Sequence, residues 1–365
     1  MSRQNIFRKT AFNLLRKILS VKEDKNFKLN HLKNVLIVRQ HNQFGDLLAS
    51  VSLFRAFKES YPDCKITLIA SPENYFAIEK NEYVDHLFVF NKRKIFSPDY
   101  FTKLTRILRQ KYDVAVVPAT VAVSKTSCIL AALSKSKKKI GPASLNGEPN
   151  PMAFVFHYRI NLDWKKCPDA HVSDFIQDII RPIGVSTKDF TSSILIEQSD
   201  KDFAREFLDS LEIKPDEYLI GFHIGAGKPQ NRWPLEKFIK LIYLIEKDFK
   251  IKLFFTGTEA DKSEIDYIQS NLNIDAGYFL NKSIPQLAAL ISESDLFITN
   301  DTGVMHVAGA VKTPQISIFG PTNPFNWAPV GKEKYFVRKS ELIADVQGEE
   351  ILNLVNIIFE NHKKI

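Results

Sequence analysis

Cysteine is scarce in this sequence of 365 residues, which contains only three. Cys64, Cys128 and Cys167 lie far apart and show no CxxC or Cys/His spacing of the kind that binds zinc. An odd number of separated cysteines predicts neither a disulfide framework nor a structural zinc site. Reduced thiols are typical of a cytoplasmic protein.

Long apolar runs are also missing. No stretch reaches the roughly 20 apolar residues that a helix needs to span a bilayer. The first residues lack the apolar core and the cleavage site of a signal peptide. The content of 44% hydrophobic and 25% charged residues is ordinary for a globular protein. We therefore expect a cytoplasmic protein.

Acidic residues are absent from the first twenty positions, which contain several basic ones. Apolar residues recur there at helical spacing, namely Phe7, Ala11, Leu14, Leu15 and Ile18. This pattern predicts a basic amphipathic extension, residues 1–33, whose helix over residues 1–20 lies on an anionic membrane surface. A helix packed on the protein, or a frayed terminus, is the alternative. The net charge of +8 fits a membrane or phosphorylated ligands, whereas no nucleic-acid-binding signature is present.

From Val35 onward the sequence alternates regularly between short β-branched runs and helical stretches. Runs such as residues 35–38 predict buried strands, and a second series begins at residue 218. This alternation predicts an α/β fold with parallel sheets covered by helices. Because the chain is too long for one core, we expect two domains, residues 34–200 and 201–365. The basic run from Lys135 to Lys139 is interpreted as a solvated loop.

The loop after the first predicted strand contains Phe44, Gly45 and Asp46. Ligands of open α/β sheets bind beyond the carboxyl ends of the strands. Gly45 permits a sharp turn, and Asp46, at the start of the next helix, is placed to accept a proton from an attacking hydroxyl. Aspartate is also a common helix N-cap, which requires no chemistry. Position alone does not separate these two interpretations.

A second loop, Gly225 to Lys228 followed by Asn231 to Pro234, comes after a strand predicted at residues 218–224. Its small residues expose backbone N–H groups that suit phosphate oxygens. Lys228 and Arg232 are suited to neutralise the same anion. A flexible glycine turn with two surface bases is the plainer interpretation, and the P-loop pattern of nucleoside triphosphatases is absent.

A third loop joins a predicted strand to a helix of small residues through Asp301, Thr302 and Gly303, with His306 roughly one turn later. The N–H groups of Thr302 and Gly303 at a helix N-terminus suit an anion, and Asp301 suits sugar hydroxyls. Helix capping by Asp301 or Thr302, with His306 in the core, is the alternative. One strand further on, the loop from Gly320 to Pro324 is expected to wall the same pocket.

Together these loops resemble glycosyltransferase family 9, the bacterial heptosyltransferase family of lipopolysaccharide core synthesis. The specific elements are Gly45-Asp46 and the pattern Asp-Thr-Gly-x-x-His-x-Ala from Asp301 to Ala308. Gly225 to Pro234 resembles the family's Gly-Ala loop leading to Arg-Trp-Pro. The segment from Phe319 to Pro329, which includes Thr322, is similar to the loop that follows the family signature.

The resemblance implies a GT-B architecture, in which two Rossmann-like domains with parallel sheets face each other across a cleft. It also implies that the last helix packs back on the N-terminal domain. The N-terminal domain would hold the acceptor, with Gln43 and Gly45 in the acceptor-side loop and Asp46 as the general base. Binding of the donor and its phosphates is then assigned to Gly225, Lys228, Arg232, Asp301, Thr302, Gly303, His306 and Thr322.

The predicted reaction is an inverting transfer of heptose from ADP-heptose to a lipopolysaccharide-core or related lipid-linked glycan. Asp46 removes the acceptor proton, and Lys228, Arg232 and the N–H groups of Thr302 and Gly303 meet the charge of the leaving nucleoside diphosphate. No side-chain nucleophile, cofactor or metal is expected. We expect a cytoplasmic enzyme, peripheral on the inner face of the membrane, with no nucleic-acid partner.

Two positions depart from the family pattern. Ser52 stands where a proline is common after the Gly-Asp loop, and Asn231 stands where a lysine often precedes Arg232. We expect Arg232 or Lys228 to supply the missing charge. Two other functions fit the motifs: another GT-B nucleotide-sugar enzyme, such as an epimerase that needs no acceptor, and a non-catalytic nucleotide-sugar-binding protein.

Overall fold

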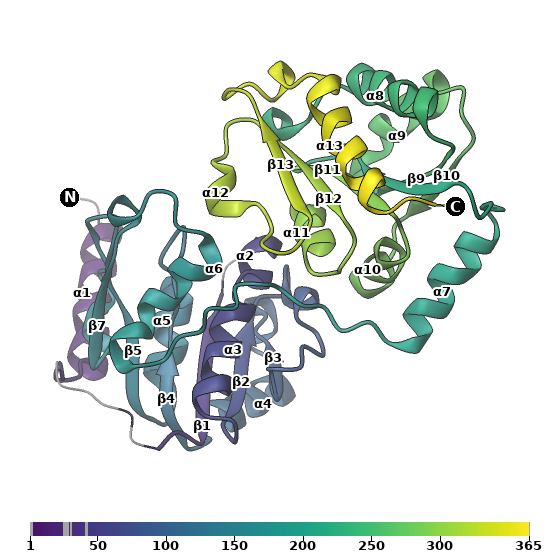
Figure 1. The fold of residues 1–365 in the computed structure, drawn as a ribbon. Coiled ribbons are helices and arrows are strands. Elements are labelled where there is room, and N and C mark those ends of the chain that lie inside the picture. The colour runs from purple at the N-terminus through teal and green to yellow at the C-terminus, as the bar shows by residue number, and fades with distance from the viewer. Residues whose placement is uncertain (1–2, 25–28, 30, 41–42, 365) are drawn as a thin grey trace. The chain divides into compact units, whose positions relative to one another are not determined.

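The computed structural model describes residues 3–24, 29, 31–40 and 43–364, which form two compact units (Figure 1). The first unit ends at Phe190 and the second begins at Thr191, earlier in the sequence than the predicted boundary at residue 200. Helix α7 (Gln198–Asp209) therefore lies entirely in the second unit. The described residues before position 34, predicted as a separate extension, are grouped with the first unit.

The first unit is built on a seven-stranded sheet with the order β3-β2-β1-β4-β5-β6, in which β7 also pairs with β5. The described pairs are parallel except that of β5 with β6. The central strands are almost wholly buried, as expected for a parallel sheet covered on both faces. The strands are β1 (Asn34–Arg39), β2 (Lys65–Ala70), β3 (His86–Val89), β4 (Tyr112–Val116), β5 (Ser136–Leu145), β6 (Glu148–Pro149) and β7 (Tyr158–Leu162).

Helices of the first unit pack on this sheet and on one another. Side chains of α4 and α5 form a core cluster with Leu36, Val38, Ala115 and Val117, which lie on one face of the sheet. Helix α3 packs against α6. The helices are α1 (Arg3–Leu19), α2 (Phe44–Leu48), α3 (Val51–Ser60), α4 (Pro98–Leu108), α5 (Lys125–Leu133) and α6 (Val172–Phe175).

The basic run from Lys135 to Lys139 lies mostly in strand β5, so its interpretation as a solvated loop is wrong. The charged ends of two of these side chains reach the carboxylates of Asp113 in β4 and of Asp24 before β1. Lys137 Nζ lies 2.8 Å from Asp113 Oδ1, and Lys138 Nζ lies 2.6 Å from Asp24 Oδ2. A basic run can therefore begin a strand when its charges have partners outside the core.

Helix α1 packs on the first unit, as in the alternative interpretation of the N-terminal segment. Phe12, Leu15 and Leu19 contact the core cluster beneath α5. The ring of Phe12 lies edge-on to that of Phe154, with centroids 5.9 Å apart. The side chain of Phe12 thus packs against the protein itself.

The same helix also exposes apolar side chains to solvent. Leu14 is 58% exposed and Ile18 is 70% exposed. The side chains of Phe7 and Ala11, on which the membrane prediction also relied, lie outside the described residues. Among the described residues, no helix has the length and apolar character that crossing a bilayer would require.

The second unit contains a six-stranded sheet, and its described pairs are all parallel, in the order β10-β9-β8-β11-β12-β13. Its core consists of apolar side chains from these strands and the covering helices. Two edge strands, β10 and β13, had no counterpart among the strands predicted from the sequence. The strands are β8 (Tyr218–His223), β9 (Ile251–Gly257), β10 (Ala276–Leu280), β11 (Leu296–Asn300), β12 (Gln315–Phe319) and β13 (Lys334–Arg338).

Helices of the second unit connect these strands in turn. The last helix, α13, packs against α8, and its Ile351, Val355, Ile358 and Phe359 enter the core of the second unit. Its return towards the N-terminal domain stays a prediction. The helices after α7 are α8 (Leu235–Asp248), α9 (Lys262–Asn271), α10 (Ile284–Ser292), α11 (Gly303–Gly309), α12 (Pro324–Trp327) and α13 (Gly348–Asn361).

Candidate functional site

Each sheet has one place where the chain reverses the direction in which it adds strands. In the first unit the chain builds β1, β2 and β3 outward and then returns to the other side of β1 with β4. The second unit repeats this order, with β11 added beside β8. Ligands of open α/β sheets bind at such a switch point, because the loops after the two adjacent strands diverge there. The predicted residues follow β1 in the first unit and β8 and β11 in the second, so both sets lie at a switch point.

Three polar side chains meet at the switch point of the first unit. Arg39 ends β1, Asp46 lies in α2, and Thr120 follows β4. Thr120 Oγ1 donates a hydrogen bond to Asp46 Oδ1 at 3.1 Å and accepts one from Arg39 Nη2 at 2.9 Å. Arg39 Nη2 also lies 3.7 Å from Asp46 Oδ1. The carboxylate predicted to act as a base is therefore held by a cation and a hydroxyl.

Burial sets the electrostatics of this cluster. The side chain of Asp46 is 0% exposed, and that of Arg39 is 2% exposed. Burial lowers the pKa of the Arg39 guanidinium, and the Asp46 carboxylate opposes this effect. An arginine keeps its charge in proteins, so the two side chains form a buried charge pair. In this arrangement the Asp46 carboxylate is not accessible to an acceptor substrate.

The local structure also addresses the alternative role of Asp46 as a helix cap. The N-cap of α2 is Gln43, and Gly45 and Asp46 lie within the first turn. Asp46 therefore lies inside the helix rather than at its cap. Arg39 and Thr120 were not identified from the sequence. The available signal for Arg39 was its position as a charged residue directly after the buried run from Val35 to Val38.

Two asparagines organise the switch point of the second unit. Asn300, at the end of β11, is fully buried. Its Nδ2 donates to the carbonyl of Ile224 at 2.7 Å, and its Oδ1 accepts from the N–H of Trp233 at 3.1 Å. Asn231 Nδ2 donates to Asp301 Oδ2 at 2.9 Å. These bonds tie the loop after β8 to the loop after β11.

Asp301 lies where three of the predicted loops come together. Burial raises the pKa of its carboxyl, whereas a hydrogen bond from Thr322 and the charge of Lys228 lower it. Thr322 belongs to the loop after β12 and Lys228 to the loop after β8. In the structure, Thr322 thus bonds to the Asp301 carboxyl, and Lys228 lies close enough for its charge to act on it, while their shared role in binding stays a prediction.

The remaining residues of the signature begin α11. Thr302 is the N-cap in an extended conformation, and its side chain accepts no hydrogen bond from the helix. Capping by Thr302, the alternative to a binding role, is therefore not observed. Gly303 is the first residue of the helix, and His306 is half-buried on it rather than enclosed in the core.

Arg232 has a different environment from the one predicted. Its Nε donates to the carbonyl of Ala226 at 2.9 Å, and its Nη1 forms an ion pair with Glu264 of α9. The guanidinium thereby holds the glycine loop against α9. Lys228, in contrast, is exposed on that loop. The geometry assigns loop positioning to Arg232 and makes Lys228 the cation more accessible to a ligand.

A close contact that also holds this loop was not predicted from the sequence. A Cβ atom added to Gly225 would overlap the Asp261 carboxylate, so the backbone passes directly over that side chain. His223, buried at the end of β8, contacts Thr256 through Nδ1, 3.1 Å from its carbonyl and 3.0 Å from its hydroxyl. Burial lowers the pKa of His223, and the Asp261 carboxylate opposes this effect.

The two switch points offer different chemistry. The second unit presents backbone N–H groups, a lysine and a carboxylate, which suit phosphates and sugar hydroxyls. The first unit presents a buried carboxylate beside an arginine. Within the described residues, no group of three or more histidine, cysteine, aspartate or glutamate side chains is placed to bind a metal ion.

Comparisons with known proteins identify the family. A family model described as glycosyltransferase family 9 (heptosyltransferase) matches residues 101–352. The lipopolysaccharide heptosyltransferase 3 of Escherichia coli strain K12 is 25% identical over 297 residues, which cover 78% of this chain and 82% of that protein.

Solved structures share the fold. A family 9 glycosyl transferase from Veillonella parvula DSM 2008 matches with a TM-score of 0.77 at 19% identity, covering 92% of this chain and 100% of that one. The E. coli ADP-heptose LPS heptosyltransferase II matches with a TM-score of 0.72 at 18% identity, covering 90% and 99%. The predicted GT-B fold with two Rossmann-like domains is confirmed, while the cleft between the domains stays a prediction.

Proposed function

Because the chain belongs to glycosyltransferase family 9 and is therefore a glycosyltransferase, we propose that it transfers heptose from ADP-heptose to a lipopolysaccharide-core or related lipid-linked glycan. The lipopolysaccharide heptosyltransferase relative and the ADP-heptose enzyme of the same fold support this choice of substrates. The observation that carries the proposal is the convergence of Asp301, Thr322 and Lys228 at the second switch point.

The donor would bind at that switch point. Lys228 and the N–H groups of Thr302 and Gly303 meet the diphosphate, and Asp301 accepts hydrogen bonds from sugar hydroxyls. Arg232 keeps the loop in place through Glu264 and Ala226. Positive groups fixed before the reaction stabilise the charge that develops on the leaving diphosphate without further reorganisation.

The transfer would proceed by direct displacement with inversion. The acceptor oxygen forms a bond to the anomeric carbon, the bond from that carbon to the diphosphate oxygen breaks, and the acceptor proton passes to Asp46. A general base must touch the group that it deprotonates. Since Asp46 is closed to solvent in this structure, the segment around it has to shift when the acceptor binds.

The positive charge for the leaving group comes from the protein in this mechanism, so no metal or cofactor is required. Turnover should therefore be unchanged after treatment with EDTA. We also assign the enzyme to the cytoplasm, peripheral on the inner face of the membrane, because the proposed acceptor is lipid-linked.

The proposal is tested first by donor binding and then by transfer. Nucleotide sugars are screened by thermal shift, since a ligand that binds the native state raises Tm. ADP-heptose should raise Tm more than UDP- or GDP-sugars, and the increase should fall in Lys228→Ala but persist in Lys240→Ala, an exposed lysine on α8.

Transfer is measured as release of ADP that depends on a heptose-deficient lipopolysaccharide acceptor. Conversion of the donor without any acceptor would instead identify an epimerase-type enzyme. Donor binding without turnover on any such acceptor would identify a non-catalytic binding protein. Either result contradicts the proposed function.

A further inference from the structure

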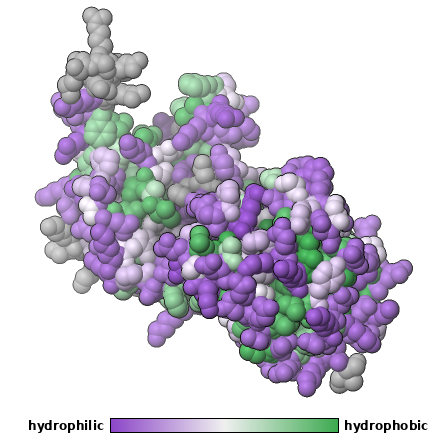
Figure 2. Space-filling model, turned by 90° about the horizontal axis from the view of Figure 1, so that it is seen from above, coloured by the Kyte–Doolittle hydropathy of each residue, from purple (hydrophilic) through white to green (hydrophobic). Residues whose placement is uncertain are grey.

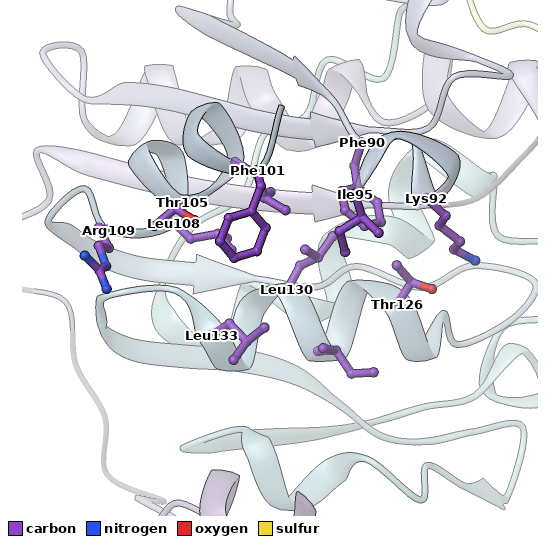
Figure 3. A pocket seen from close by; sticks show the side chains of 12 residues that line it. Phe90, Lys92, Ile95, Phe101, Thr105, Leu108, Arg109, Thr126, Leu130 and Leu133 are labelled. Atoms are coloured by element: carbon purple, nitrogen blue, oxygen red, sulfur yellow. The ribbon is translucent and has the colours of Figure 1, made fainter. Parts of the chain in front are cut away.

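An apolar pocket of about 490 Å³ lies between α4 and α5 of the first unit, separate from the residues of either switch point. Figure 3 shows side chains of α4 and α5 converging on it, with Phe101 from α4 and Leu133 from α5 at its rim. These two side chains are 54% and 55% exposed. Nearby Phe96 is 93% exposed. A group of exposed large apolar side chains is typical of an interaction surface.

Basic side chains lie at both ends of this pocket. Lys92 and Arg109 lie at its opposite ends (Figure 3). Nine lysines and arginines, but only two acidic residues, Asp99 and Asp113, occur between residues 91 and 136. All nine bases are exposed. In the part of the chain that the structure describes, none of the nine forms an ion pair, while Asp113 pairs with Lys137 outside this segment.

Helix α1 extends the same kind of surface. Both α1 and α5 pack against residues 153–155, and side chains of α1, α4 and α5 share one core cluster. Beside the exposed Leu14 and Ile18, α1 exposes Lys9, Arg16 and Lys17. Figure 2 shows that apolar side chains gather at separate places on a surface that is otherwise mostly hydrophilic.

We propose that the α4–α5 surface, defined as the pocket with Phe96, Phe101, Leu133, Lys92 and Arg109, docks the first unit on an anionic lipid bilayer. Unpaired bases complement anionic headgroups, and exposed apolar side chains between them enter the boundary between headgroups and acyl chains. A polyanion would match the bases but leave the apolar rim in water. An uncharged protein surface would cover the rim but leave the bases without counter-charges.

This docking surface deepens the peripheral location given under the proposed function. It locates membrane contact on α4 and α5, whereas the sequence pointed to residues 1–20. The inference does not depend on donor or acceptor. Donor binding measured without vesicles therefore tests the proposed function separately from it.

The test is sedimentation of the full chain with vesicles of phosphatidylethanolamine and phosphatidylglycerol. The protein should sediment with these vesicles but not with phosphatidylcholine alone, and about 0.5 M salt should release it because salt screens the charges. Phe101→Ser with Leu133→Ser should lower the bound fraction at least about fivefold, since the apolar anchors are lost. Lys92→Glu with Arg109→Glu should have a similar effect.

Matched controls separate this surface from general effects of polarity and charge. Leu342→Ser with Ile357→Ser removes two exposed apolar side chains of the second unit, and Lys201→Glu with Lys240→Glu makes the same change in charge there. Both control proteins should bind vesicles as the wild type does. If a control loses binding as strongly as the α4–α5 variants, the proposal is overturned.

A second measurement does not depend on removing any group. In Phe101→Trp, the fluorescence of the new indole should shift to the blue and be quenched by brominated lipids when anionic vesicles are added. An unchanged indole spectrum would overturn the docking surface. So would loss of binding confined to Leu14→Ser with Ile18→Ser, because that result would place the contact on α1 alone.

Discussion

Among single residues, Asp46 is the one on which proton transfer depends in the proposed reaction. Asp46→Asn keeps the size of the side chain and a partner for Thr120, but the amide cannot take a proton. Turnover should fall about 100-fold or more, while the Tm increase caused by the donor stays the same. Asp113→Asn, which removes a carboxylate paired with Lys137 in the same unit, should leave turnover unchanged. Full activity of Asp46→Asn would remove this residue from the mechanism.

His223 predicts a specific dependence of stability on pH. Burial lowers the pKa of the folded histidine below its usual 6.5. Below about pH 6.5 the unfolded chain therefore binds a proton that the folded protein excludes, and the free energy of unfolding falls as the pH falls. His223→Gln, which cannot titrate, should show a shallower decrease between about pH 6.5 and pH 4.5 in urea unfolding. Equal slopes for the two proteins would show that folding does not lower the pKa of His223.

At the level of elements, the loop after β8 depends on the close passage of Gly225 over Asp261. The Asp261 side chain cannot move away easily, because its Oδ2 accepts hydrogen bonds from the N–H and the hydroxyl of Thr258 at 2.9 and 3.0 Å. Gly225→Ala should lower the free energy of unfolding by about 1–3 kcal/mol and weaken donor binding, because the loop must move.

Gly227 provides the control within the same loop. A Cβ atom there meets nothing within 4 Å. Gly227→Ala should therefore unfold at nearly the wild-type urea concentration and bind the donor normally. Equal effects at the two glycines would show that general loss of loop flexibility, rather than the contact with Asp261, determines the result.

Sequence patterns predicted the elements that are buried on both faces. The runs at residues 35–38, 66–69 and 114–117 became β1, β2 and β4, because continuous β-branched and leucine side chains suit a covered parallel sheet. Strand β5 was missed because a basic run occupies its first half, and the carboxylates that meet the charges of Lys137 and Lys138 come from Asp113 and Asp24, far away in the sequence. The edge strands β10 and β13 are only partly buried and lack an equally strong signal.

The candidate sites show the same division between local and distant information. Motif spacing predicted that Asp301 and Lys228 share a site, since loops at neighbouring strand ends converge. It could not predict that Arg39 and Thr120 hold Asp46, or that Glu264 pairs with Arg232, because these partners lie on different elements. Side-chain pairs across loops require the coordinates of both elements.

At the level of the whole molecule, each unit has its own sheet and core. The residues proposed to bind the donor all belong to the second unit, between Gly225 and Thr322. A fragment of residues 191–365 should therefore unfold cooperatively in urea, and ADP should raise the Tm of the fragment and of the full chain by similar amounts. A fragment that folds but does not respond to ADP would show that the nucleotide site needs the first unit.

The reversal of strand order occurs once in each unit, between β1 and β4 and between β8 and β11. In both places the strands supply buried packing, and the loops beyond their ends supply the polar groups. If the donor binds as proposed, substitutions after β8, β11 and β12 should change the preferred sugar without disturbing the scaffold around β1. With the donor and the acceptor assigned to separate sheets in this proposal, the sugar that is donated and the glycan that is modified should be able to change separately during evolution.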